Sequence, residues 1–252
     1  MTFSLTVLGA ATPYPAPDAA CSGYLLRAGA ARVWVDAGFG TFANLQRHMD
    51  PAELDAIWIS HLHLDHSHDL QTAFYGLAYG QMGLKAPIPV YGPPGWVAKY
   101  FGEHAGHFTD VTEVFEMHEI AEDWSGRVGD LRLSVCRVNH AQPAYGLRAE
   151  YEGRVLVYSG DTAPCESLVE LAAGADLFVC EADFDSPEQR TEYILHSTPE
   201  EAAQMATDAG VKKLMVTHVA YNLGVEVATA RAAVAFGGPT VSARDNETHR
   251  IS

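Results

Sequence analysis

The chain has 252 residues, of which 48% are hydrophobic and 19% are charged, and its formal net charge is −16 at pH 7. This composition is typical of a globular protein with a substantial core, and we expect a single domain over residues 1–252. Proteins that bind a polynucleotide backbone normally carry a basic stripe, so the acidic excess argues against long nucleic acid as a partner. A small anionic substrate can still bind if divalent ions supply positive charge locally.

The sequence shows no targeting or membrane segment. Residues 1–8 lack the basic and long apolar regions of a secretory signal, and no stretch is long and apolar enough to span a membrane. We therefore expect a cytoplasmic protein with no membrane partner. The cysteines are far apart and include no Cys-x-x-Cys pair, and we interpret them as reduced, packed thiols. They are Cys21, Cys136, Cys165 and Cys180.

Apolar patterning predicts the elements of the first half. Strands are expected at residues 3–8, 22–27, 32–35, 57–59 and 87–91, and helices at 42–48, at 70–84 and from the turn at 92–95 to about 104. Prolines should stiffen the loop at 9–18. Within the helix at 70–84, the aromatic stripe from Phe74 to Met82 favours core packing or a subunit interface, with a lid as the alternative.

The second half is predicted in the same way. Strands are expected at 131–138, 144–151, 155–158, 176–180 and 213–216, helices at 165–172 and 199–210, and a last helix and strand after them. Thr198 can cap a helix whose first turn contains Pro199, and Glu201 completes a capping box. Consecutive strands in each half predict two sheets packed face to face with helices outside. His104, His107 and His118 lie in a poorly patterned stretch and are interpreted as surface residues.

A polar cluster directly follows the strand at 57–59. His61-Leu-His63-Leu-Asp65-His66 offers three imidazoles and one carboxylate, which are the ligands of zinc and similar divalent ions. A solvated loop whose histidines only form hydrogen bonds is the alternative. Because so short a segment cannot direct all four side chains to one ion, we expect two divalent ions. We favour Zn²⁺, while Mn²⁺ and iron are tolerated by the same ligands.

Further candidate residues stand where other predicted strands end. They are Asp36, His140, Asp161, Glu181 and His218. Taken alone, Asp36 beside a glycine could equally stabilise a turn. Rigid strand ends can hold such side chains in a fixed geometry.

In this order, Asp36, the His61-x-His63-x-Asp65-His66 loop, His140, Gly160-Asp161-Thr162 and Thr217-His218 resemble the metallo-β-lactamase superfamily of metal-dependent hydrolases over nearly the whole chain. Tyr145-Gly146, Ser159-Gly-Asp-Thr162, Glu181-Ala-Asp-Phe184 and His196-Ser-Thr198 are similar to the ribonuclease Z branch and its phosphodiesterase relatives. The resemblance implies one α/β domain, a four-layer αββα sandwich, with a two-metal site at one edge. It also implies a homodimer.

The resemblance assigns roles to the candidate residues. His61, His63 and His140 would hold one metal, and Asp65, His66 and His218 the other, with Asp161 bridging both. Two ions about 3.5–4 Å apart can acidify a bridging water and clamp the attacking and leaving oxygens of a phosphoryl displacement.

The remaining roles concern protons and orientation. Asp65 would also accept the proton of the nucleophile, and Asp36 would hold a histidine in the required tautomer. His196 would assist the leaving group and be oriented by Glu181. For His196, helix capping or a hydrogen bond to backbone is the alternative.

The sequence departs from ribonuclease Z in two places. That branch carries a tRNA-binding arm, in many members inserted between the strand after His140 and the strand before Asp161, whereas here only residues 149–158 intervene and predict a plain hairpin. Asp69 stands where the branch usually has glycine. The missing arm and the acidic charge argue against processing of tRNA precursors.

The favoured function is therefore hydrolysis of a small phosphodiester, such as a cyclic nucleotide, and arm-less proteins of this pattern are similar to bacterial cyclic-nucleotide phosphodiesterases. A lactone or thioester hydrolase is the nearest alternative, since the same hydroxide attacks a carbonyl carbon. His196 and Glu181 argue against it, because a leaving-group acid suits phosphodiester cleavage. Ribonuclease Z-type tRNA 3′ processing and a catalytically silent metal-binding scaffold are further alternatives.

Overall fold

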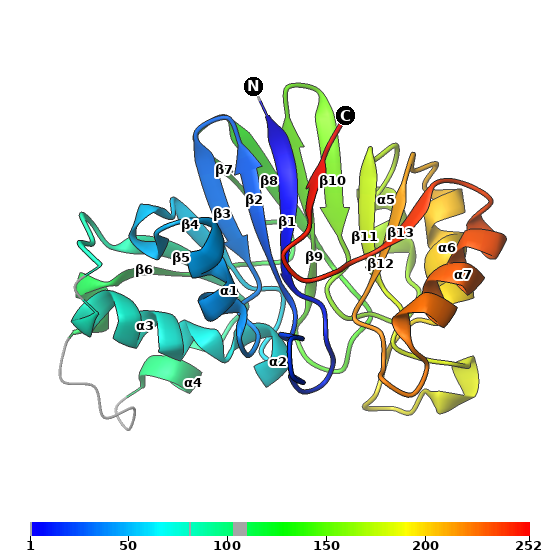
Figure 1. Ribbon diagram of the computed structural model, residues 1–252, viewed down its shortest axis with the longest axis horizontal. Coiled ribbons are helices and arrows are strands. Elements are labelled where there is room, and N and C mark those ends of the chain that lie inside the picture. The colour runs from blue at the N-terminus through cyan, green and yellow to red at the C-terminus, as the bar shows by residue number, and fades with distance from the viewer. Residues whose placement is uncertain (1, 81, 103–109) are drawn as a thin grey trace.

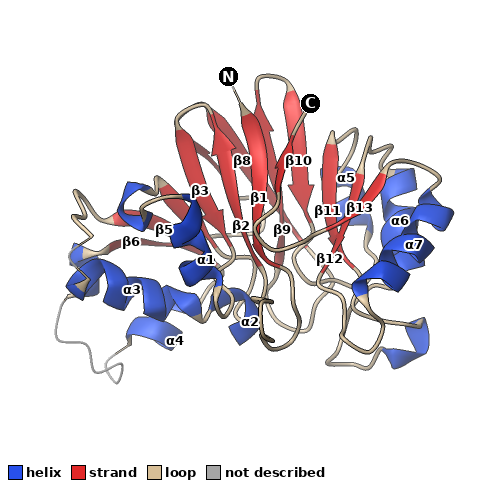
Figure 2. Ribbon diagram, in the orientation of Figure 1, coloured by secondary structure: helices blue, strands red, loops and turns tan. Residues whose placement is uncertain are grey.

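The computed structural model describes residues 2–80, 82–102 and 110–252. Within these residues, two seven-stranded sheets pack face to face and helices cover both outer faces (Figures 1 and 2). This is the predicted four-layer αββα sandwich.

The first sheet has the strand order β14-β1-β2-β3-β4-β5-β6. Its strands are β1 (Phe3–Gly9), β2 (Gly23–Ala28), β3 (Ala31–Val35), β4 (Ala56–Trp58), β5 (Ile88–Gly92), β6 (Phe115–Glu119) and β14 (Thr248–Arg250). Successive side chains of a strand point to opposite faces. In β3, Val33 and Val35 accordingly lie in the core between the sheets, while Trp34 lies in the core under the helices.

The second sheet has the order β13-β12-β11-β10-β9-β8-β7. Its strands are β7 (Ser125–Val128), β8 (Leu131–Arg137), β9 (Tyr145–Tyr151), β10 (Arg154–Tyr158), β11 (Leu177–Glu181), β12 (Leu214–Thr217) and β13 (Thr240–Ser242). β9 and β10 form the plain hairpin expected at residues 149–158, with Glu152 and Gly153 at positive φ in the turn. This hairpin leaves no room in the sequence for an inserted arm.

Each sheet has its own helical layer. The first sheet is covered by α1 (Thr41–His48), α3 (Asp69–Tyr79) and α4 (Trp96–Phe101), and the second by α5 (Glu166–Leu171), α6 (Pro199–Asp208) and α7 (Val225–Phe236) (Figure 2). Short helical turns complete the described elements: α2 (Leu64–Ser67) and the 3₁₀ turns Pro51–Glu53, Val111–Glu113 and Pro187–Gln189. The predicted capping box of α6 is confirmed, because Glu201 accepts a hydrogen bond from the backbone N–H of Thr198 at 2.9 Å and the Thr198 hydroxyl accepts one from that of Glu201.

The aromatic stripe of α3 divides between core and surface. Phe74 is fully buried against α4 and β6, and Met82 packs beside the same core. Tyr75 and Tyr79 are 49% and 44% exposed. The helix also ends at Tyr79, earlier than the predicted residue 84. Core packing therefore accounts for only part of the stripe.

The sequence analysis did not predict the strands β6, β7 and β14. All three lie at sheet edges, and many of their residues are polar and exposed or half-exposed. His118 belongs to β6, where its half-exposed ring stacks on Tyr91 with centroids 4.8 Å apart. His104 and His107 lie outside the described residues. All four cysteines are free, as expected. No helix in the described part of the chain is long and apolar enough to cross a membrane.

Candidate metal centre and active site

The strands bring the candidate residues together because their carboxyl ends meet at one edge of the sandwich, where ligands of such α/β sheets bind. Asp36 follows β3, His61 follows β4, and His140 follows β8. Asp161 and His218 follow β10 and β12, while Glu181 ends β11. All are nearly or fully buried.

Two groups of side chains could each hold a metal ion. In the first group, Nε2 of His61 lies 3.1 Å from Nδ1 of His63, which in turn lies 3.3 Å from Nε2 of His140. In the second, Nε2 of His218 lies 3.3 Å from Oδ2 of Asp65, and Nε2 of His66 lies 3.7 Å from the same oxygen. Within each group the ligand atoms lie within 4.8 Å of one another.

Asp161 stands between the two groups. Its Oδ2 lies 3.4 Å from Nε2 of His61, whereas its Oδ1 lies 3.2 Å from Nε2 of His66 and 3.5 Å from that of His218. One carboxylate therefore directs an oxygen to each side, which is the arrangement that a bridging ligand needs.

The protonation states of the clustered histidines follow from their burial and from the charges beside them. Burial lowers the pKa of His61, His63 and His140 to about 4. These imidazoles are consequently neutral near pH 7, the form in which histidine binds metals. Burial also opposes a charge on His66, but the carboxylates of Asp161 and Asp65 outweigh it and raise the pKa of His66 well above its usual value.

The donor set fits divalent ions. Oδ1 of Asp161 and Nε2 of His66 are buried and have no hydrogen-bond partner. Leaving two such atoms unsatisfied inside a protein is costly, and a cation between them satisfies both. Imidazole and carboxylate ligands suit Zn²⁺ as well as neighbouring divalent metals.

Asp36 lies at the centre of a hydrogen-bond network under this site. Its Oδ2 accepts from Nδ1 of His66, from the hydroxyl of Ser60 and from that of Tyr158, each at 2.8 Å, and its Oδ1 accepts from the Ser60 backbone. A proton fixed on Nδ1 leaves Nε2 of His66 free to bind a metal. Ser60 also lies 3.0 Å from Nδ1 of His61. Sequence reasoning found Asp36 but missed Ser60 and Tyr158.

Two residues of the site have strained backbones. Asp36 and His218 have φ of 56° and 50°, a region that side chains other than glycine rarely adopt. Such strain persists where the surroundings fix it and is frequent at functional sites. Here it turns both side chains from their strand ends toward the cluster.

His196 and Glu181 form a hydrogen-bonded pair beside the metal-ligand groups. Nδ1 of His196 lies 2.9 Å from Oε1 of the fully buried Glu181. Burial opposes a charge on His196, but Glu181 outweighs it and raises the pKa of His196 to about 10. The His196 ring stacks on that of His218, with centroids 5.5 Å apart, and it also lies close enough to Asp161 and His218 to form a third ligand group.

The loop that carries His196 also supports the first metal-ligand group. Nδ1 of His140 lies 3.1 Å from the carbonyl oxygen of Leu195. Arg190 donates to the carbonyl of His196 at 2.9 Å and pairs with Glu201 of the α6 capping box. Backbone carbonyls leave no signal in the sequence, and neither Leu195 nor Arg190 was predicted.

Asp69 has a structural contact. Its Oδ2 accepts a hydrogen bond from the backbone N–H of Phe42 at 2.9 Å, in the first turn of α1, where Gly40 offers no side-chain cap. A carboxylate there accepts a hydrogen bond from a free helix N–H, and its negative charge interacts favourably with the positive end of the helix dipole. Asp69, the first residue of α3, thus links α1 to the helix that follows the His61–His66 segment.

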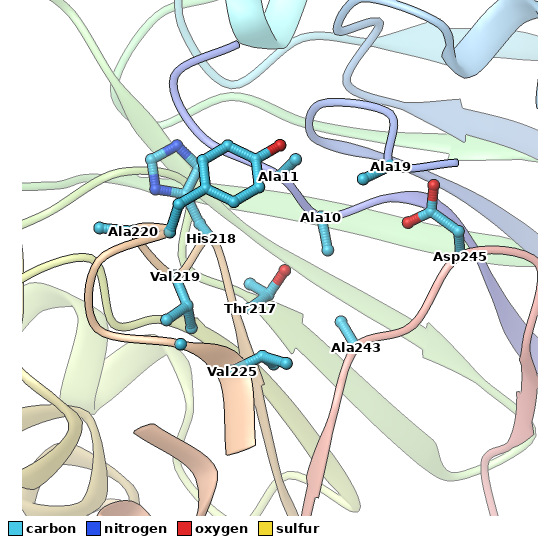
Figure 3. A pocket seen from close by; sticks show the side chains of 12 residues that line it. Ala10, Ala11, Ala19, Thr217, His218, Val219, Ala220, Val225, Ala243 and Asp245 are labelled. Carbon is cyan, nitrogen blue, oxygen red and sulfur yellow. The ribbon is translucent and has the colours of Figure 1, made fainter. Parts of the chain in front are cut away.

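A cavity of about 180 Å³ adjoins the site through His218. Figure 3 shows small side chains around it, with His218 and Asp245 on opposite sides. It lies between the loop after β1 and the segments after β12 and β13, and its lining includes Ala10, Ala11, Thr217, Val225, Ala243 and Asp245. The lining is mainly apolar, with Asp245 as the one carboxylate among the described lining residues.

The chain belongs to the metallo-β-lactamase superfamily of hydrolases: a beta-lactamase superfamily domain matches residues 31–219. The protein Rv1339 of Mycobacterium tuberculosis, which is named as uncharacterized, is 35% identical over 253 positions that cover 98% of this chain and 92% of that protein. Ribonuclease Z of Mycobacterium bovis BCG is 34% identical over 276 positions that cover 98% of this chain and 97% of that enzyme.

A solved structure agrees with this assignment. The metallo-beta-lactamase fold protein YhfI from Bacillus subtilis matches with a TM-score of 0.87 at 24% identity, covering 99% of this chain and 100% of that one. The likeness confirms the predicted fold.

Proposed function

We propose that this protein is a binuclear metal-dependent phosphodiesterase that cleaves a small phosphodiester, such as a cyclic nucleotide. The carrying observation is the Glu181–His196 pair, which presents a protonated imidazole beside two metal-ligand groups. Phosphodiester cleavage expels an alkoxide, and an acid at that position can protonate it.

The ligand roles are part of this proposal. His61, His63 and His140 would hold one ion, Asp65, His66 and His218 would hold the other, and Asp161 lies where it could reach both. Bound there, two divalent ions would supply Lewis-acid chemistry, lowering the pKa of an attacking water and neutralising charge on the phosphoryl oxygens.

The side chains of the chain then move the protons. Asp65 accepts the proton of the attacking water, because Asp65 faces His218 and is held ionised: burial opposes ionisation, but His66 and His218 lower its pKa below its usual value. His196 donates its proton to the leaving oxygen, and Glu181 stabilises the imidazolium before the transfer. Glu181 keeps its position through hydrogen bonds from the backbone N–H groups of Thr162, Asp183 and Ser197.

We infer that the substrate is small from the net charge, from the length of an alignment and from a short hairpin. The net charge of −16 repels a long polyanion. The ribonuclease Z alignment spans 276 positions, more than the 252 residues of this chain, so that enzyme contains segments that this chain lacks. The short β9–β10 hairpin supports the same inference.

We also propose that residues 1–252 form a single domain that assembles as a homodimer. The single domain is supported by the path of the C-terminal segment, since β13 joins the second sheet and β14 returns to β1 of the first. The homodimer rests on the resemblance to the ribonuclease Z branch.

The test is hydrolysis of methyl 4-nitrophenyl phosphate by protein loaded with Zn²⁺ or Mn²⁺, followed by a panel of cyclic nucleotides. Asp161→Ala controls for adventitious activity. Turnover that disappears in this variant supports the proposal. Absence of turnover from protein shown by metal analysis to hold two ions contradicts it and favours a lactone or thioester as substrate.

A further inference from the structure

The loop that carries His196 has little packing to hold it in place. Residues 182–198 connect β11 to α6, and within them residues 185–196 are all exposed or half-exposed. Tyr193, near the tip of the loop, is 72% exposed. A segment with few buried apolar contacts opens readily. The position of His196 must therefore be set by polar contacts.

One arginine makes two of these contacts. Nε of Arg190 donates to the backbone carbonyl of His196 at 2.9 Å, and Nη2 of Arg190 pairs with Oε2 of Glu201. The same oxygen of Glu201 accepts the backbone N–H of Thr198 at 2.9 Å in the capping box of α6. Because a guanidinium holds its donors in a rigid plane, Arg190 ties the carbonyl of His196 to the first turn of that helix.

The other contacts of this segment restrain the ring and the next peptide. Oε1 of Glu181 lies 2.9 Å from Nδ1 of His196, and its Oε2 accepts the backbone N–H of Ser197 at 3.2 Å. The Ser197 hydroxyl donates to the carbonyl of Thr162 at 2.7 Å. Among these contacts, that of Arg190 is the one that holds the backbone carbonyl of His196.

We propose that Arg190 is a positioning residue: by fixing the carbonyl of His196, it keeps the imidazole beside the metal-ligand groups. A nitrogen of His196 lies within 4.8 Å of the ligand atoms of Asp161 and His218. The inference rests on the proposed function, in which His196 is the leaving-group acid. Displacing a reacting group by about 1 Å can cost about 10²-fold in rate.

Steady-state kinetics of Arg190→Met tests this role. We expect kcat for a cyclic nucleotide to fall by about 10–10²-fold, with KM and the content of two ions unchanged. For methyl 4-nitrophenyl phosphate, kcat should change little, because nitrophenolate leaves without an acid. An equal loss on both substrates would assign Arg190 a general structural role and overturn the proposal.

A double-mutant cycle shows whether Arg190 acts through His196. In the His196→Ala background, Arg190→Met should lower kcat for the cyclic nucleotide no further, since the group that it positions is gone. The same loss in both backgrounds would contradict the proposal.

Arg231 provides a matched control in the same loop. It donates to the carbonyl of Asp185 at 2.8 Å and pairs with the carboxylates of Asp185 and Glu200, so it holds the start of the loop with the same kinds of contact. Arg231→Met should leave the ratio of the two kcat values as in the wild type. A shift as large as that of Arg190→Met would remove the specific role of Arg190.

Arg190→Lys covers the case in which the methionine variant does not fold. Lysine keeps a positive charge for Glu201, but one ammonium does not reproduce the planar fork that also reaches the carbonyl of His196. We expect a loss that is again confined to the cyclic nucleotide. A lysine variant that equals the wild type on both substrates would show that charge alone suffices and would overturn the bridging role.

Amide hydrogen exchange of the zinc-loaded full chain, followed by mass spectrometry, tests the positioning without turnover. The N–H groups of Ser197 and Thr198 should exchange faster in Arg190→Met than in the wild type or in Arg231→Met. Unchanged protection there overturns the proposal. If this difference is found in a protein that cleaves neither substrate, the positioning stands and the phosphodiesterase function fails.

Discussion

Oε1 of Glu181 lies 2.9 Å from Nδ1 of His196 and also accepts the backbone N–H of Thr162 at 2.7 Å, in the segment that carries Asp161. One buried oxygen thus connects the proposed acid to the proposed bridging ligand. Any movement of the acid relative to the metal-ligand groups must distort one of these two hydrogen bonds.

Removing the acid should affect substrates according to their leaving groups. We expect His196→Ala to lower kcat for a cyclic nucleotide, which expels an alkoxide, by about 10²–10⁴-fold. The loss should be much smaller for methyl 4-nitrophenyl phosphate, because nitrophenolate leaves without protonation. Steady-state kinetics on both substrates measures the difference, and metal analysis serves as the control. A variant that retains one ion instead of two would show that His196 is a ligand and not the acid.

The pH dependence follows from the same pair. The acid acts in its protonated form, and the pKa of His196 is raised to about 10, so kcat for the cyclic nucleotide should hold up to that pKa and fall as the pH rises through it. Glu181→Gln removes the carboxylate that raises this pKa, and the fall should move to lower pH. Profiles that coincide for the wild type and Glu181→Gln would contradict this assignment.

Metal removal should destabilise the fold. Without ions, Asp161 Oδ1 and His66 Nε2 stay buried without a hydrogen bond of good geometry, although they lie 3.2 Å apart. A ligand at a hundred times its Kd stabilises the folded state by about 2.7 kcal/mol, and for a chain of this size each kcal/mol shifts Tm by about 2–4 °C. We therefore expect EDTA to lower Tm by about 5–10 °C in calorimetry. Asp161→Ala should show a smaller response, and an equal one would argue against its contact with the ions.

Asp69 should contribute to stability and not to chemistry. Asp69→Ala leaves the N–H of Phe42 without its acceptor, and we expect the free energy of unfolding to fall by about 1–3 kcal/mol. Asp69→Asn retains an acceptor and should lose less. Urea denaturation measures both variants. If the alanine variant instead unfolds like the wild type, the contact with α1 carries no stability.

The two sides of α3 should respond differently to truncation. Phe74 is fully buried, and Phe74→Ala should cost about 3–5 kcal/mol through the cavity that it leaves. Tyr75 is half exposed, and Tyr75→Ala should cost no more than about 1 kcal/mol. Similar losses in urea denaturation would show that the exposed side of the helix is covered in solution.

Most residues of the two metal-ligand groups could be predicted, because histidines and aspartates that can bind metals stand in short segments directly after apolar strands. His61, His63, Asp65 and His66 follow β4 directly, and the structure brings them beside His140, Asp161 and His218 from other strands. The hydrogen-bond partners could not be predicted. Ser60 and Tyr158 are ordinary polar residues in sequence, and only the packing of the two sheets places both against Asp36.

The edge strands of the two sheets could not be predicted from the sequence either. β6 and β7 expose polar residues, so they lack the apolar alternation that marks a half-buried strand. Central strands such as β3 and β11 bury both faces and gave a strong apolar signal. The predicted end of α3 was also wrong. Met82 and Leu84 continue the apolar composition after the helix ends at Tyr79, so composition alone does not mark the last turn.

The pairing of β14 with β1 also bears on the order of folding. Thr6 and Thr248 share a hydrogen bond between hydroxyls at 2.8 Å, across nearly the full length of the chain. During synthesis from the N-terminus, this edge of β1 therefore stays unpaired until residues 248–250 have left the ribosome. Until then β1 presents unpaired backbone groups, which is the kind of edge on which nascent chains associate. Once β14 has been synthesised, it pairs with β1 and takes its place as the short edge strand of the sheet.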